Sequence, residues 1–132
     1  YSFLCIIYPV NIQQIALKEK LFDVPYRAGY IIKQGQLVHN WKQRWLTLRN
    51  NEITYSTHQN CLPLNTLLVN EIQHITVVDN VKFIFQIQFN PPSKRILILQ
   101  CKTKEEMVDW MGVIQKAVKF WTFRLNQVGP MK

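Results

Sequence analysis

Acidic residues are scarce in this chain, and their scarcity limits what the protein can bind. Asp and Glu number 8 in 132 residues, against 16 Lys and Arg, so the formal net charge is +8 at pH 7. Such an excess of positive charge favours an acidic partner, which can be an anionic membrane leaflet, a nucleic acid or an acidic protein. The charge excludes none of these three, so the choice among them depends on sequence patterns.

Cysteine is also sparse. The chain has 3 cysteines, Cys5, Cys61 and Cys101, which lie far apart in the sequence. Metal-binding cysteines usually lie a few residues apart, and disulfide frameworks use an even number. We therefore expect reduced thiols, no bound metal and a cytoplasmic location.

Long apolar runs are absent too. The longest, residues 3–10, contains Pro9 and is far shorter than the about 20 residues that a helix needs to cross a bilayer. The sequence therefore predicts no membrane-spanning segment. The chain starts at Tyr1 rather than Met, so we expect a trimmed chain, and any upstream targeting or lipidation signal would lie outside it.

Residues 1–26 differ in pattern from the rest and are predicted to form an N-terminal extension. Ile12 and Ile15 begin a helix-like apolar stripe, Asn11 can cap its start and Pro25 can stop it. This pattern predicts a short amphipathic helix. Its apolar residues either pack over the following domain and extend its core, or contact a membrane or a protein partner.

From Gly29 onward, apolar and polar residues alternate with the period of two that is typical of β-strands. Asn50 and Asn51 form a tight-turn signal, and residues 90–93 contain two prolines that interrupt the pattern. These breaks divide the region into a meander of antiparallel hairpins. The predicted strands cover residues 30–33, 41–49, 53–57, 64–69, 72–78, 82–89 and 96–101.

The last predicted element is a helix with a clear start signal. Thr103 and Glu106 match a capping box, in which each side chain bonds a backbone N–H of the first turn. Apolar residues then recur at steps of three and four up to Trp121, and residues 122–132 are predicted to be a tail. The fold class is therefore mostly β with one C-terminal α-helix. We expect a seven-stranded antiparallel β-barrel or sandwich whose open end is capped by the amphipathic helix.

Catalytic and nucleic-acid-binding signals are missing. The sequence contains no nucleophile elbow, phosphate-binding loop or metal-binding cluster. It also contains no recognition-helix or RNA-binding strand motif. We therefore expect neither an enzyme nor a nucleic-acid partner, and we expect no cofactor.

Several segments together resemble the pleckstrin homology (PH) domain family. Residues 29–35 are similar to the family's first strand, residues 41–48 to its second and residues 53–55 to its third. Trp110 stands where the family nearly always keeps a tryptophan, on the core face of the last helix, which implies a structural role. The resemblance covers residues 29–118, and we place the domain at 27–121.

The resemblance also implies a binding site. Lipid-binding members of the family carry a Lys at the end of the first strand and a Lys/Arg-x-Arg motif in the second, and these positions are Lys33, Lys42 and Arg44 here. Tyr55 stands where a third-strand tyrosine often joins them. In such domains these groups hold phosphates at the open end of the barrel. No Asp or Glu occurs from residue 28 to residue 51, and Arg presents a planar fork that suits phosphate oxygens.

The loop between the first two strands carries Leu37, Val38 and His39. An exposed apolar pair beside cations suits shallow insertion into a bilayer, although the loop can instead fold back on the barrel. The tightest phosphoinositide binders often have a further basic residue after the third strand, where this chain has only His58 and Pro63. That difference favours a simpler anion, such as phosphatidic acid or a singly phosphorylated inositide.

The sequence therefore predicts a membrane-targeting module that binds anionic phospholipid headgroups and associates peripherally with a membrane. The alternative is a protein-interaction module of the same fold, acting in signalling or trafficking with little lipid binding. Such a module would bind its partner through the helix, a strand edge or residues 1–26.

Overall fold

The computed structural model describes residues 24–91 and 94–128, and these form seven strands and a long helix. The predicted helix within residues 1–26 lies almost entirely outside this range. The strands are β1 (Arg27–Gln34), β2 (Trp41–Arg49), β3 (Glu52–Ser56), β4 (Asn65–Leu68), β5 (Ile72–Asp79), β6 (Ile84–Phe89) and β7 (Ile96–Gln100). A short 3-10 helix, η1 (Val69–Glu71), joins β4 to β5, and α2 (Lys104–Val128) ends the chain.

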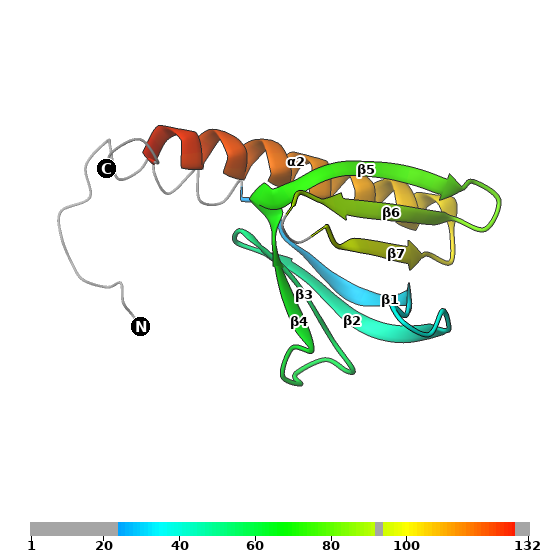
Figure 1. Ribbon diagram of the computed structural model, residues 1–132. Coiled ribbons are helices and arrows are strands. Elements are labelled where there is room, and N and C mark those ends of the chain that lie inside the picture. Colours follow the sequence, from blue (N-terminus) through cyan, green and yellow to red (C-terminus); the bar gives the residue numbers. More distant parts are fainter. Residues whose placement is uncertain (1–23, 92–93, 129–132) are drawn as a thin grey trace, which may run out of the picture.

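The strands form one antiparallel sheet in the order β4-β3-β2-β1-β7-β6-β5. Strands β1 to β4 and strands β5 to β7 each pair with their neighbours in sequence, as expected for hairpins. The two halves meet where β1 pairs with β7, through only Ile32 with Gln100 and Lys33 with Leu99. Figure 1 shows the resulting curled sheet, with α2 running along the side of β5 and β6. The predicted fold class is confirmed.

The core lies between the inner faces of the curled sheet and α2. Alternate residues of each strand point inward, so that Leu46 and Leu48 of β2 meet Phe85 and Ile87 of β6, all almost fully buried. The helix contributes four buried side chains spaced by three or four residues, namely Met107, Trp110, Ile114 and Ala117. The apolar residues of the helix, spaced by three or four, and those of the strands, spaced by two, therefore form a single buried cluster.

The predicted capping box starts α2. Thr103 Oγ1 accepts the Glu106 backbone N–H at 3.1 Å, and Glu106 Oε1 accepts the Lys102 backbone N–H at 2.9 Å. The prediction ended the helix too early, because α2 continues past Trp121 to Val128. Residues 122–128 contain neither glycine nor proline, so no residue type in that stretch breaks a helix. Figure 1 shows this last part of α2 extending beyond the sheet.

Three predicted strands are shorter than expected, the seventh only by its last residue, because β7 ends at Gln100. The fourth strand gives way to η1 at Val69, and the sixth begins at Ile84 because Phe83 has a φ of 60° and belongs to the preceding turn. A positive φ is costly for a bulky residue, so Phe83 is held by its surroundings. Its carbonyl accepts the Cys101 N–H at 2.9 Å, which fixes the turn against the end of β7.

None of the helices among residues 24–91 and 94–128 is both long and apolar enough to cross a membrane. The same described residues contain no group of three or more His, Cys, Asp or Glu side chains that could hold a metal ion.

Candidate functional site

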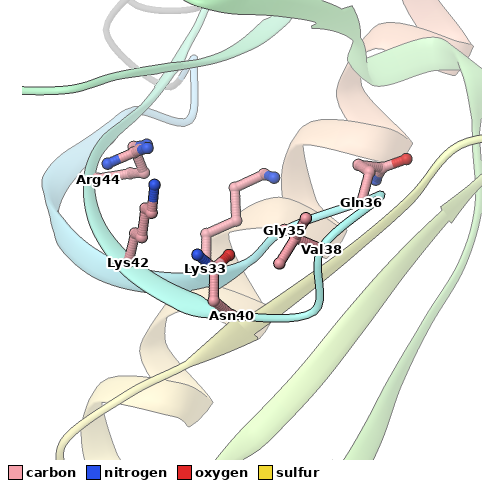
Figure 2. A pocket seen from close by; sticks show the side chains of 7 residues that line it. All are labelled: Lys33, Gly35, Gln36, Val38, Asn40, Lys42 and Arg44. Carbon is pink, nitrogen blue, oxygen red and sulfur yellow. The ribbon is translucent and has the colours of Figure 1, made fainter.

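Basic side chains replace apolar ones where the inner face of the sheet reaches the end of the β1–β2 hairpin. On β2 the inward positions are Lys42 and Arg44, followed by the buried Leu46. On β1, Lys33 follows the buried Ile31, and the register pairs Lys33 with Lys42. Side chains of paired residues lie on the same face. Figure 2 shows Lys33, Lys42 and Arg44 pointing to the same side of the hairpin.

These three cations line one pocket of about 300 Å³. The remaining lining residues all come from the β1–β2 loop, and they are Gly35, Gln36, Val38 and Asn40. None of the lining residues is acidic. Three positive groups therefore share an open pocket without a carboxylate to neutralise them, which favours an anionic ligand.

The β1–β2 loop, residues 35–40, has a fixed shape. Gly35 N–H donates to the Asn40 carbonyl at 2.8 Å, and Asn40 N–H donates to the Val38 carbonyl at 2.8 Å. A Cβ on Gly35 would collide with the Val38 carbonyl oxygen, so only glycine fits this turn. Gln36 Nε2 donates to the Ile96 carbonyl at 2.8 Å and ties the loop to β7.

The loop does not fold back on the barrel. Leu37 is 96% exposed and Val38 is 69% exposed, and His39 is exposed beside them. The bonds within the loop and to β7 are formed by the backbone and by Gln36, so they leave the apolar side chains in solvent. The loop therefore presents an apolar pair next to the cations, and its insertion into a membrane stays a prediction.

Lys33 is more enclosed than the sequence indicates, because its side chain is only 7% exposed. Its Nζ lies 4.5 Å from the centre of the Tyr55 ring and donates to the Gln34 carbonyl at 3.3 Å. Burial lowers the pKa of the Lys33 ammonium below its ordinary value of 10.5, and the Arg95 and Arg44 guanidinium groups lower it further, while Tyr55 opposes the shift. The cations of the site therefore repel one another when no anion is present.

Lys42 and Arg44 are less constrained. Lys42 is exposed, and Arg44 is half-buried with its Nη1 donating to the Gln43 carbonyl at 2.9 Å. Among the described residues, neither forms an ion pair with a carboxylate. Both side chains are therefore free to bind an added anion.

Arg95, which was not predicted as a site residue, belongs to the same region. Arg95 Nη2 donates to the Tyr55 hydroxyl at 2.7 Å, so Tyr55 connects Arg95 to Lys33. Arg95 does not line the pocket itself. Its Nε is buried and makes no hydrogen bond within the described part of the chain. The signal was present, because Arg95 precedes the buried Leu97 and Leu99 by the two-residue period, as Arg44 precedes Leu46.

Trp110 lies away from the pocket, in the middle of the core face of α2. Its ring is fully buried, and the Arg27 guanidinium carbon lies 4.9 Å from the ring centre. Trp110 thus packs the helix against the sheet and does not face the mouth of the barrel.

The chain belongs to the PH domain family, because residues 25–119 match the family model described as "PH domain". This match spans all seven strands and most of α2. The fold and the order of its elements agree with this assignment.

Curated relatives contain the domain as a small part of a longer chain. A RAC family serine/threonine-protein kinase homolog of Dictyostelium discoideum is 29% identical over 87 residues, which cover 65% of this chain and 19% of the relative. Human Pleckstrin-2 is 48% identical over 33 residues, which cover 25% of this chain and 9% of the relative. The matched region is thus under a fifth of either protein.

Solved structures show the same fold. The C-terminal PH domain of pleckstrin, in a crystal structure with D-myo-Ins(1,2,3,5,6)P5, has a TM-score of 0.62 and 26% identity, covering 70% of this chain and 93% of that one. The PH domain of human TBC1 domain family member 2 has a TM-score of 0.62 and 27% identity, covering 75% of this chain and 83% of that one.

Proposed function

We propose that this PH domain targets its protein to membranes by binding an anionic phospholipid headgroup in the pocket of Lys33, Lys42 and Arg44. The observation that carries the proposal is the convergence of three cations on one open pocket whose lining contains no acidic residue. A phosphate group there accepts hydrogen bonds from two lysines and from the planar Arg44 fork. The complex of the pleckstrin domain with an inositol pentakisphosphate supports a ligand of this class.

Tyr55 and Arg95 act as supporting groups in this proposal. The Tyr55 hydroxyl accepts from Arg95 and its ring lies beside the Lys33 ammonium. These contacts keep Lys33 and Arg95 at the open end of the barrel, where both positive charges attract an anion. Residues 57–64 contain no Lys or Arg, and His58 is their one basic candidate, so we expect phosphatidic acid or a singly phosphorylated inositide to suffice.

The β1–β2 loop completes the site. Leu37, Val38 and His39 lie on the exposed tip of the loop, and the fixed turn at Gly35 holds the tip beside the cations. When a headgroup occupies the pocket, this tip enters the interfacial region of the bilayer. Each basic residue near an anionic leaflet contributes about 1 kcal/mol, and each methylene that leaves water contributes about 0.8 kcal/mol.

A vesicle flotation experiment tests the proposal. The double variant Lys42→Ala/Arg44→Ala loses two pocket cations, and we expect vesicle affinity to fall about 30-fold, from about 1 kcal/mol per cation. The charge-matched control is Lys116→Ala/Lys119→Ala, two exposed lysines of α2, which should change affinity far less. Vesicles contain phosphatidylcholine with phosphatidic acid or with a phosphatidylinositol monophosphate, and binding should weaken with added salt.

Equal losses in the two double variants would show that net charge, rather than the pocket, drives the association. Undiminished flotation of Lys42→Ala/Arg44→Ala would reject the pocket outright. A protein partner that still binds this variant, and is lost when residues 1–26 are removed, would support the alternative of a protein-interaction module.

A further inference from the structure

A second apolar loop lies beside the Tyr55 end of the site. The β3–β4 loop, residues 57–64, begins two residues after Tyr55 and carries Leu62 and Leu64. Leu62 is 88% exposed and Leu64 is 54% exposed. Only Pro63 separates the two leucines, so the loop exposes two large apolar side chains close together in the sequence.

The loop is held open by hydrogen bonds that leave its leucines in solvent. Leu64 N–H donates to the Tyr55 carbonyl at 2.8 Å, and Cys61 N–H donates to the His58 carbonyl at 3.2 Å. Gln59 N–H donates to the Tyr30 hydroxyl at 3.2 Å. The Tyr30 ring itself packs edge-on against Trp45, with ring centres 4.8 Å apart. The exposure of the leucines thus follows from a fixed loop shape.

The surroundings of this loop suit an anionic surface. No Asp or Glu occurs between Glu52 and Glu71, so the loop can approach a negative surface without repulsion from its own residues. Its base is the Tyr55 backbone, and the Tyr55 side chain carries the Lys33 and Arg95 contacts. Figure 1 shows the β3–β4 loop at the bottom of the view and the β1–β2 loop at the right-hand end of its hairpin, both below α2.

We propose that the β3–β4 loop is a second membrane-inserting element, so that the domain enters an anionic bilayer through Leu62 and Leu64 as well as Leu37 and Val38. This inference rests on the proposed headgroup binding, because the pocket cations bring both loops to the surface. Apolar tips combined with cations fit the interfacial region of a bilayer, where the tips leave water and the cations meet phosphates. Two insertion points also fix the tilt of the domain, which one loop cannot do.

Fluorescence at Cys61 tests the insertion directly. Cys101 is buried and Cys61 is exposed, so the Cys5→Ser variant can be labelled at Cys61 with an environment-sensitive dye. We expect a blue shift, and quenching by lipid-borne quenchers, with phosphatidylcholine vesicles that contain phosphatidic acid or a phosphatidylinositol monophosphate. A soluble inositol phosphate should produce neither. A dye at Val38→Cys, in a Cys5→Ser/Cys61→Ser background, reports the first loop in the same way.

A binding measurement complements the dye. Leu62→Ala/Leu64→Ala should weaken vesicle binding about tenfold, which corresponds to about 1.4 kcal/mol, and leave binding of a soluble inositol phosphate unchanged. The control Phe123→Ala removes an exposed aromatic ring from the far end of α2 and should change neither. Thermal unfolding of each variant checks that the fold is kept.

The outcomes separate this inference from the proposed function. A dye response at position 38 without one at position 61 overturns the second insertion and leaves headgroup binding intact. Vesicle binding that the two leucine changes do not weaken overturns it as well. Loss of both dye responses together with absent flotation rejects the proposed function itself. Insertion at position 61 that survives Lys42→Ala/Arg44→Ala would show that the loop inserts without the pocket.

Discussion

Replacing Lys33 should make the domain more stable and less able to bind. Lys33→Met keeps an unbranched side chain of similar length but removes an ammonium that is 7% exposed and lies near two arginines. Replacing a buried ion pair by apolar residues of similar volume often stabilises a protein by about 1–4 kcal/mol, and removing Lys33, which has no carboxylate partner among the described residues, forfeits no ion-pair attraction. The cation–π contact with Tyr55 opposes this gain by about 0.5–2 kcal/mol. We therefore expect a net gain of about 1 kcal/mol, or a melting temperature higher by about 4 °C.

The gain should depend on pH in a defined direction. The pKa of Lys33 in the folded domain is lowered from 10.5. Below that lowered pKa the ammonium is charged in both the folded and unfolded states, so the folded domain bears the full cost of burying this charge near two arginines. Between the lowered pKa and 10.5 the folded lysine is neutral while the unfolded one is charged, so the wild type gains stability as pH rises. The advantage of Lys33→Met should therefore shrink at alkaline pH.

Urea denaturation at neutral and alkaline pH, in low salt, measures this difference. The control is Lys116→Met, which exchanges an exposed helical lysine for a residue of similar helix propensity and should leave stability unchanged. Vesicle binding of Lys33→Met should fall about fivefold, from the loss of about 1 kcal/mol for one basic group. A destabilised Lys33→Met with a neutral control would refute the reasoning, since Lys33 would then be a net source of stability.

Two further predictions concern single hydrogen-bonding groups. Tyr55→Phe removes the acceptor of the 2.7 Å bond from Arg95, and urea denaturation should show a loss of about 1–2 kcal/mol. This loss should widen when an inositol phosphate is added, because the variant binds the anion less tightly and is stabilised less by it; an unchanged midpoint would show that Arg95 does not need Tyr55. Asp79 Oδ1 accepts the Val81 and Lys82 N–H groups, each at 2.9 Å, and these bonds lower the pKa of the Asp79 carboxyl from 3.8. Asp79→Ala should therefore lower the free energy of unfolding above about pH 4. The difference in unfolding free energy between wild type and variant, measured by urea denaturation, should narrow as acid protonates Asp79. A difference that stays constant with pH would contradict this.

Local patterns in the sequence were sufficient to predict most of the fold. The capping box of Thr103 and Glu106, the alternation of β2 and the turn at Asn50 each depend on residues a few positions apart. A single sequence shows such signals because the interactions behind them join residues that are close together in the chain. Phe83 was misassigned to a strand because no local pattern marks its positive φ; its carbonyl bonds the N–H of Cys101, which lies far away in the sequence.

The candidate site was only partly predictable for the same reason. Lys33, Lys42 and Arg44 lie on one hairpin, so their convergence follows from pairing within that hairpin. Arg95 reaches the site from the residue just before β7, and that placement depends on how the sheet curls to bring β7 beside β1. The burial of Lys33 was not foreseen either, because it depends on neighbours from other strands, among them the Tyr55 ring of β3, whose centre lies 4.5 Å from the Lys33 Nζ.

The short pairing between β1 and β7 makes the site a point where a ligand can affect the rigidity of the sheet. Two residue pairs join the halves of the sheet there, and Lys33 belongs to one of them. The pocket cations belong to one half, while Arg95 belongs to the other. An anion that contacted both groups would link the two halves of the sheet without a covalent bond. Ligand binding would then reduce the motion of the two halves relative to each other at the β1–β7 pairing.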